Sequence, residues 1–230
     1  MPRKLNTPEL ARSHGLAGVG FAALIVLGNA VLVPAGMPVT GTETGEVLAF
    51  FAGERTAVGL AAALTPLTWV LAALFGAGAV RALWDAEHER RQAWALAGLA
   101  GLILQNALFA VVIAIRLALA STEHSEDAAR ALWSLHDAVF TLNGTFLALA
   151  MVGLSLAGLR AGLIPRWHAA LGMTGAALQF TSASLAALVI DHAGPLGLIG
   201  LTGWLLWVVW IAAYGLTLAR VTPWRRAAAS

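Results

Sequence analysis

Long apolar segments separated by short polar stretches make up almost the whole chain. Six of them are long enough to cross a membrane, because a bilayer core of about 30 Å needs roughly 20 apolar residues in a helix. They cover residues 15–35, 56–80, 93–118, 131–157, 167–190 and 195–219. In the longest connection, the sequence GEVLAFFAG (45–53) is typical of either a short helix on the membrane or a loop. The pattern predicts an all-α membrane protein, a bundle of six transmembrane helices that forms a single domain over residues 1–230.

Basic residues lie mostly on one side of these predicted helices. Of the 14 lysines and arginines, only Arg55, Arg116 and Arg130 fall on the side opposite the N-terminus. Cytoplasmic segments of membrane proteins carry an excess of lysine and arginine. We therefore expect the N and C termini to be cytoplasmic, and the protein to lie in the cytoplasmic (inner) membrane.

Composition agrees with a membrane protein and excludes several other classes. Hydrophobic residues make up 59% of the chain and charged residues 11%, whereas soluble domains average about 45–50% and 25%. The net charge of +2 comes without a basic stripe or a stacking motif, so we expect no nucleic-acid partner. The absence of cysteine excludes disulfides, thiolate metal sites and iron–sulfur clusters.

The segment ALWSLHDAVFTLNGTF, residues 131–146, combines a spanning helix with several polar side chains. Apolar residues at spacings of three and four form a stripe that suits the lipid face: Leu135, Val139, Leu142 and Phe146. The polar residues fall on the opposite side or beside it: Ser134, His136, Asp137, Thr141 and Asn143. A charged group facing hydrocarbon costs about 2.5–3.5 kcal/mol or more, so we expect these polar side chains to face the bundle.

Other predicted helices place polar residues at a comparable depth. Arg116 lies near the outer end of its helix, and Gln105 lies 11 residues earlier on the same face. We expect Asp137 to pair with Arg116 or Arg55, because charges inside a membrane are usually paired. The resulting hypothesis is an outward-facing polar pocket with these ligand-binding residues: His136, Asp137, Arg116, Gln105 and Asn143.

The run LRAGLIPRWHAALGMTGAALQ (159–179), which follows a helix containing LHDAVF (135–140), resembles an uncharacterised family of bacterial multi-pass membrane proteins. That family is known only as a domain of unknown function. Its best marker in this chain is the short inner turn with Gly162, Pro165 and Arg166. The resemblance covers most of the chain and implies a bacterial cytoplasmic membrane protein, but it implies no catalytic residues.

These features leave the molecular activity undetermined among three classes. The leading hypothesis is a non-enzymatic protein that binds or passes a small or lipidic ligand, with membrane lipids and a small hydrophobic ligand as partners. The first alternative is a metal-assisted membrane hydrolase with these ligands: His136, Asp137, Asp191 and His192. The second alternative is a scaffold or partner subunit held by seams of small residues.

No cofactor is predicted. A zinc ion at the two His/Asp pairs is a weaker alternative, because no HxxxH or HExxH spacing supports it. A haem between His136 and His192 is weaker still, since both histidines lie near the membrane surface. The oligomeric state is left open, with a homo-oligomer among the alternatives.

Overall fold

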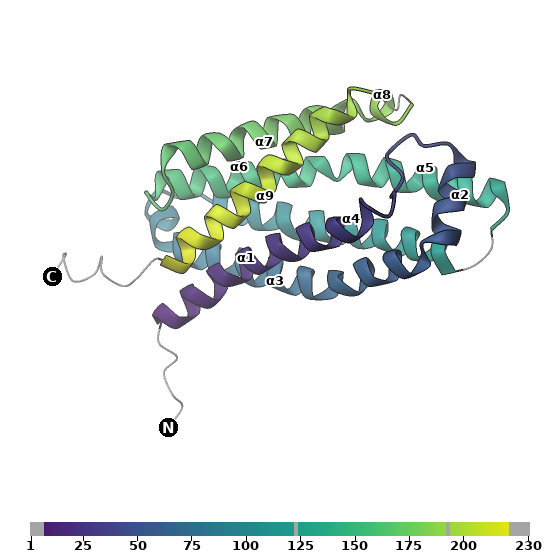
Figure 1. Cartoon of the computed structure of the whole chain (residues 1–230). Coiled ribbons are helices and arrows are strands. Elements are labelled where there is room, and N and C mark those ends of the chain that lie inside the picture. The colour runs from purple at the N-terminus through teal and green to yellow at the C-terminus, as the bar shows by residue number, and fades with distance from the viewer. Residues whose placement is uncertain (1–6, 122–123, 192–193, 221–230) are drawn as a thin grey trace.

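The computed structural model describes residues 7–121, 124–191 and 194–220, and all regular structure in these ranges is helical (Figure 1). In chain order the helices are α1 (Thr7–Leu32), α2 (Thr44–Gly53), α3 (Arg55–Glu89), α4 (Trp94–Ser121), α5 (Glu126–Leu142), α6 (Gly144–Arg160), α7 (Arg166–Ser184), α8 (Ala186–Asp191) and α9 (Gly197–Arg220). The prediction of an all-α fold is therefore confirmed.

Several of these helices are suited to a membrane. Five segments are long and apolar enough to cross one: Arg12–Leu32, Arg55–Glu89, Trp94–Ser121, Glu126–Arg160 and Gly197–Arg220. They match five of the predicted spans, and they confirm the expected class of multi-helix membrane protein. The remaining predicted span, 167–190, is divided between α7 and α8 and is not among these five segments.

The long helices form a closed ring of neighbours. Around the ring, α1 packs on α3, α3 on α4, α4 on α6, α6 on α7, α7 on α9, and α9 on α1 again. α5 lies at the end of the bundle opposite the described chain ends, beside α2 and α8 (Figure 1). α1 begins and α9 ends at the same end of the bundle (Figure 1), where Gly15 touches the backbone at Ala219.

Large side chains fill the middle of this ring. The core includes Phe21, Phe75, Met151, Trp207 and Tyr214, all almost fully buried. Their rings meet edge to face, with centroids 5.5 Å apart for Phe21 and Trp207 and 5.7 Å apart for Phe75 and Tyr214. Such pairs stabilise a core beyond their buried area. The part of the bundle nearer the described chain ends is therefore a packed core rather than an open pore.

A second, smaller core closes the opposite end of the bundle. The stretch 45–53 forms the helix α2, so the helical alternative is confirmed, and it buries Val47, Phe50 and Phe51. These side chains pack against the ends of α3, α4 and α5, for example against Trp133. α2 therefore covers the end of the bundle with a packed apolar face, and it holds the loop before it, residues 33–43, over α5.

The turn that marks the family resemblance is a helix end of a common type. Gly162 has a φ of +67°, and the N–H of Leu163 donates to the carbonyl of Gly158 over 2.8 Å. This left-handed residue with a backward hydrogen bond satisfies carbonyl groups at the end of α6. Pro165, with extended backbone, then begins α7. The chain reverses within a few residues, which places α6 and α7 side by side.

Candidate functional site

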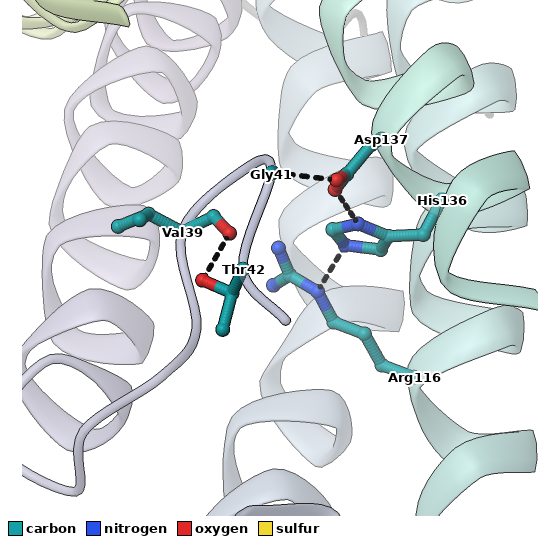
Figure 2. A network of polar contacts seen from close by, with 6 residues as sticks. All are labelled: Val39, Gly41, Thr42, Arg116, His136 and Asp137. Carbon is teal, nitrogen blue, oxygen red and sulfur yellow. Dashed lines mark hydrogen bonds and ion pairs between the residues drawn. The ribbon is translucent and has the colours of Figure 1, made fainter. Parts of the chain in front are cut away.

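His136 and Asp137 lie in the middle of α5 and face the interior of the protein. Their exposed fractions are 3% and 2%. Nδ1 of His136 lies 2.9 Å from Oδ1 of Asp137, and the other carboxylate oxygen accepts a hydrogen bond of 2.9 Å from the backbone N–H of Gly41 (Figure 2). Both carboxylate oxygens of Asp137 are thus engaged, one by its own neighbour and one by the loop before α2.

Arg116 of α4 completes the arrangement from the other side of the imidazole. Its Nε donates a hydrogen bond of 3.0 Å to Nε2 of His136. Since Nε2 accepts a hydrogen bond, a neutral imidazole carries its proton on Nδ1, and this N–H donates a hydrogen bond to Asp137. A neutral histidine therefore bridges a cation and an anion. We call Arg116, His136 and Asp137 the relay.

Asp137 does not form the expected direct pair with Arg116 or Arg55. The carboxylate is linked to Arg116 through His136 rather than by direct contact. Arg55, the other predicted partner, is exposed at the start of α3 and has no ion pair with Asp137. An imidazole between the two charges keeps them apart, while each charge still has a hydrogen-bonding partner inside the bundle.

Aromatic rings enclose the relay. The imidazole of His136 stacks on Trp133 at 4.2 Å and is parallel to Phe140 at 5.8 Å between centroids. The guanidinium carbon of Arg116 lies 6.0 Å from the ring centroid of Phe109 and 5.9 Å from that of Phe140. Guanidinium groups are attracted to aromatic faces at such distances. The relay therefore has apolar walls, which strengthen any electrostatic interaction inside them.

The terminal nitrogens of the Arg116 guanidinium are not used by His136. Within the described chain, Nε is its one hydrogen-bonding nitrogen, and Nη1 and Nη2 have no partner. Figure 2 shows these terminal nitrogens directed toward the loop that carries Gly41 and Thr42. A guanidinium has five N–H donors in a planar fork. Most of its donors are thus available to an acceptor that enters between the loop and α4.

The loop itself is ordered by local hydrogen bonds. The hydroxyl of Thr42 donates to the carbonyl of Val39 over 2.7 Å, and the Thr42 N–H donates to the same carbonyl over 3.1 Å. Gly41 has a φ of +84°, a conformation in which glycine avoids the steric penalty of other residues. This turn aims the N–H of Gly41 at Asp137. The sequence contains no signal for that contact, which joins residues 96 positions apart.

Gln105 and Asn143, which were predicted in the same pocket, are buried but lie at another depth. Each is 6% exposed. Gln105 is 11 residues from Arg116 along α4, and Asn143 is seven residues from His136 along α5, which correspond to roughly 16 Å and 10 Å along a helix axis. The structure therefore brings His136, Asp137 and Arg116 together, but places the two amides deeper in the bundle.

The predicted orientation of residues 131–146 is largely confirmed. Leu135 and Leu142 are 51% and 50% exposed on the outer surface, whereas Thr141 is buried. The prediction was wrong for Ser134, which is exposed. Ser134 lies two turns from the start of α5, and a serine hydroxyl on a helix can bond to a carbonyl of its own helix without a bundle partner.

The second His/Asp pair lies mostly outside the described residues. Asp191 ends α8, and His192 lies outside the described ranges. Among the side chains that are described, no three histidine, aspartate or glutamate residues are placed to share a metal ion.

A polar network at the other end of the bundle was missed by sequence reasoning. His168 of α7 is fully buried, and its Nε2 lies 2.9 Å from the carbonyl of Trp210. The indole N–H of Trp210 donates to Ser155 over 3.0 Å, and Tyr214 donates to the carbonyl of Leu154 over 3.2 Å. These contacts tie α6, α7 and α9 together. Each residue alone is a common membrane-helix residue, so the sequence offers no signal for the network.

Comparison with known proteins places the chain in one family. Residues 16–215 match the sequence profile of a family described as a domain of unknown function (DUF4386). No curated protein and no solved structure matches the chain.

Proposed function

The chain belongs to this family of unknown function, and we propose from the geometry of the relay that it binds a lipidic ligand with an acidic headgroup. The headgroup is held by Arg116. The observation that carries the proposal is the guanidinium whose terminal nitrogens have no partner in the described chain and point toward the covering loop (Figure 2).

An acidic group suits this position better than a neutral one. Guanidinium forks bind carboxylate and phosphate oxygens with parallel, charge-assisted hydrogen bonds. Asp137 does not compete for the fork, because both of its oxygens are already engaged by His136 and Gly41. The nearest charge to an entering anion is therefore the cation, and the aspartate lies behind the imidazole.

The surroundings of Arg116 favour a ligand with a hydrocarbon tail. Phe140 lies against the guanidinium and is also 42% exposed on the outer surface. Leu117, next to Arg116 in sequence, is 42% exposed as well. A tail can thus lie along the lipid-facing side of α4 and α5 while the headgroup reaches the fork.

The proposal includes an orientation in the membrane. The described ends of the chain lie together at one end of the bundle (Figure 1), which is the arrangement expected for an even number of crossings with α7 and α8 as the sixth. Most arginines lie at that end, so it is cytoplasmic by the positive-inside rule. Arg116 is five residues from the end of α4 at the opposite side. The relay is then near the outer surface of a bacterial cytoplasmic membrane.

Ligand binding to purified protein in detergent tests the proposal. Hexadecanoate, a lysophospholipid with a phosphate headgroup, and hexadecanol as an uncharged control are titrated by calorimetry. We expect one of the acidic lipids to bind at least about tenfold more tightly than the alcohol, because charge-assisted hydrogen bonds contribute about 1.5–3 kcal/mol. The preferred acid distinguishes a carboxylate ligand from a phosphate ligand.

Two variants separate a specific site from general lipid affinity. Arg116→Gln should lose the preference for the acid, and Arg116→Lys should keep part of it because the charge remains without the fork. Arg55→Gln is the matched control, since Arg55 is an exposed arginine at the same end of the bundle. Equal affinity of wild type and Arg116→Gln for every acidic lipid would contradict the proposal.

A further inference from the structure

Gln105 and Asn143 are buried amide side chains that lack hydrogen-bonding partners. Oε1 of Gln105 and Oδ1 of Asn143 have none in the described chain, and both side chains are 6% exposed. A buried polar group without a partner destabilises a protein, and more so inside a membrane. The two amides therefore favour a ligand that supplies the hydrogen-bonding partners which the described chain does not.

The two amides lie in the same seam between α4 and α6. Gly98 and Gly101 form the α4 side of this seam, and Gln105 continues the same face one turn further on. A methyl group on Gly101 would come within 2.5 Å of the backbone nitrogen of Ala150 and 2.8 Å of the carbonyl oxygen of Phe146. The backbones of α4 and α6 are thus in direct contact at this level.

The register of this contact places Gln105 opposite Asn143. Gly98 lies against Leu154, whereas Gly101 lies against Ala150 and Phe146, so the two helices run in opposite directions. Gln105 is one turn beyond Gly101, and extending the register by that turn puts it at the level of Asn143, the residue before α6. The two amides do not bond to each other in the structure, and the side-chain oxygen of each is buried without a partner in the described chain.

A third amide borders this level. A methyl group on Gly144 would lie 2.9 Å from both the backbone carbonyl oxygen and the side-chain oxygen of Gln179 on α7. The Gln179 side chain is itself anchored, because its Nε2 donates to the carbonyl of Gly200 over 3.0 Å. The amide pair therefore lies where α4, the α5–α6 junction and α7 approach one another.

One layer of phenyl rings separates the amide pair from the relay. Phe109 is one turn outward from Gln105 on α4, and Phe140 is three residues outward from Asn143 on α5. Their ring centroids are 6.4 Å apart, and the Arg116 guanidinium packs on the rings. The bundle thus has two polar levels: a charged one near its outer end and an uncharged one beneath these rings.

We infer that Gln105 and Asn143 form a second binding site, which takes an uncharged group that both donates and accepts hydrogen bonds. This inference rests on the proposed function, because the group is taken to be the headgroup of a lipidic ligand in an uncharged form. A primary amide and a protonated carboxyl are such headgroups. Residues 94–115 and 138–159 contain no charged side chain. An ion at this level would have no counter-charge, whereas a neutral group satisfies both amides.

Binding of a long-chain primary amide to the full-length protein tests the inference. Hexadecanamide should bind wild type at least about tenfold more tightly than its N,N-dimethyl derivative, which keeps the tail but has no N–H donor. This comparison needs no variant. Equal affinity for the two compounds, or no binding of hexadecanamide, would overturn the second site.

Variants locate the site. Gln105→Met and Asn143→Leu should each weaken hexadecanamide binding at least about tenfold, and should leave hexadecanoate binding at alkaline pH unchanged. The matched control is Asn106→Leu, because this neighbouring amide is half-buried and bonded to the carbonyl of Leu102. Gln105→Met should also raise the melting temperature without ligand, since it removes an unpartnered polar group. Undiminished amide binding in both variants would refute the assignment.

These measurements test the Arg116 headgroup site and the Gln105–Asn143 site independently of each other. Arg116→Gln should weaken hexadecanoate but not hexadecanamide. If amide binding depends on Gln105 while acid binding does not depend on Arg116, the second site stands and the headgroup site does not. The reverse result retains Arg116 as the headgroup site and overturns the amide site.

Discussion

Nε of Arg116 and Nε2 of His136 are joined by a hydrogen bond of 3.0 Å, and this bond connects α4 to α5 at the closed end of the bundle. It makes the histidine an acceptor toward the arginine and a donor toward Asp137. The relay is therefore directional, with a cation at one end and an anion at the other. Its neutrality as a unit explains how three ionisable residues are tolerated within helices that cross a membrane.

The first prediction concerns the imidazole. His136→Phe preserves stacking on Trp133, but Arg116 loses its hydrogen bond and Asp137 keeps only the one from the Gly41 N–H. We expect a loss of unfolding free energy of roughly 2–4 kcal/mol, measured by denaturation in detergent. Leu135→Phe, at an exposed neighbouring position, should change it by less than about 0.5 kcal/mol. Similar losses for both variants would show that the polar contacts contribute nothing.

The second prediction concerns the carboxylate. Asp137→Asn removes the negative charge that balances Arg116 and turns one acceptor into a donor facing Gly41 or His136. Removing one partner of a buried charge pair costs about 3–5 kcal/mol, so a large fall in thermal stability is expected. Asp127→Asn is the control, because Asp127 is exposed in the first turn of the same helix. Equal melting shifts for Asp137→Asn and Asp127→Asn would refute the stabilising link between Asp137, His136 and Arg116.

The third prediction concerns the contact between α4 and α6. Gly101→Ala forces a methyl group to within 2.5 Å of the Ala150 backbone nitrogen, and backbone cannot move aside as a side chain can. We expect a destabilisation of roughly 2–3 kcal/mol. Gly59→Ala, in an α3 position with nothing within 4 Å, should instead stabilise by about 0.5–1 kcal/mol. Melting temperatures that shift in the same direction would contradict the close approach.

The fourth prediction concerns Glu87, which is 8% exposed near the end of α3. Both of its carboxylate oxygens accept from the N–H of Ala95, at 3.1 and 3.0 Å, at the start of α4. Glu87→Gln removes the charge that interacts with the positive end of the helix dipole, at a cost of about 1 kcal/mol. Glu89→Gln, exposed two residues further on, should have almost no effect on the same unfolding curve.

The fifth prediction concerns Arg91, the one non-glycine residue with positive φ in the described chain, at 51°. The N–H of Gln92 donates to the carbonyl of Glu87 across it, over 2.9 Å, as at a glycine-terminated helix. Arg91→Gly should stabilise by about 1 kcal/mol because the left-handed backbone is strained for arginine. Arg90→Gly, where φ is −91°, should give no such gain; a gain of equal size would show that charge rather than strain is responsible.

Prediction from the sequence succeeded where the membrane alone sets the rule. An ionisable side chain that faces hydrocarbon is costly, so the spacing of Leu135 and Leu142 against Asp137 and Thr141 determined which face of α5 is buried. The same rule does not extend to Ser134, because a serine hydroxyl can bond to a carbonyl of its own helix and so is tolerated on either face. It also does not specify which inward-facing residues meet, since Gln105 and Arg116 share one face of α4 but lie at different depths.

By itself, the sequence determined an all-helical membrane protein, the approximate limits of its spans, and the burial of His136 and Asp137. The physical reason is that unpaired backbone groups and ionisable side chains are both costly in contact with hydrocarbon. Only the tertiary structure decided that His136 stands between Arg116 and Asp137, and that Gly41 reaches Asp137 from a loop 96 residues away. It also decided that the side-chain oxygens of Gln105 and Asn143 are buried without a partner in the described chain. These contacts depend on helix register and close backbone packing, which arise from the fit of whole helices against one another and leave no local pattern in the chain.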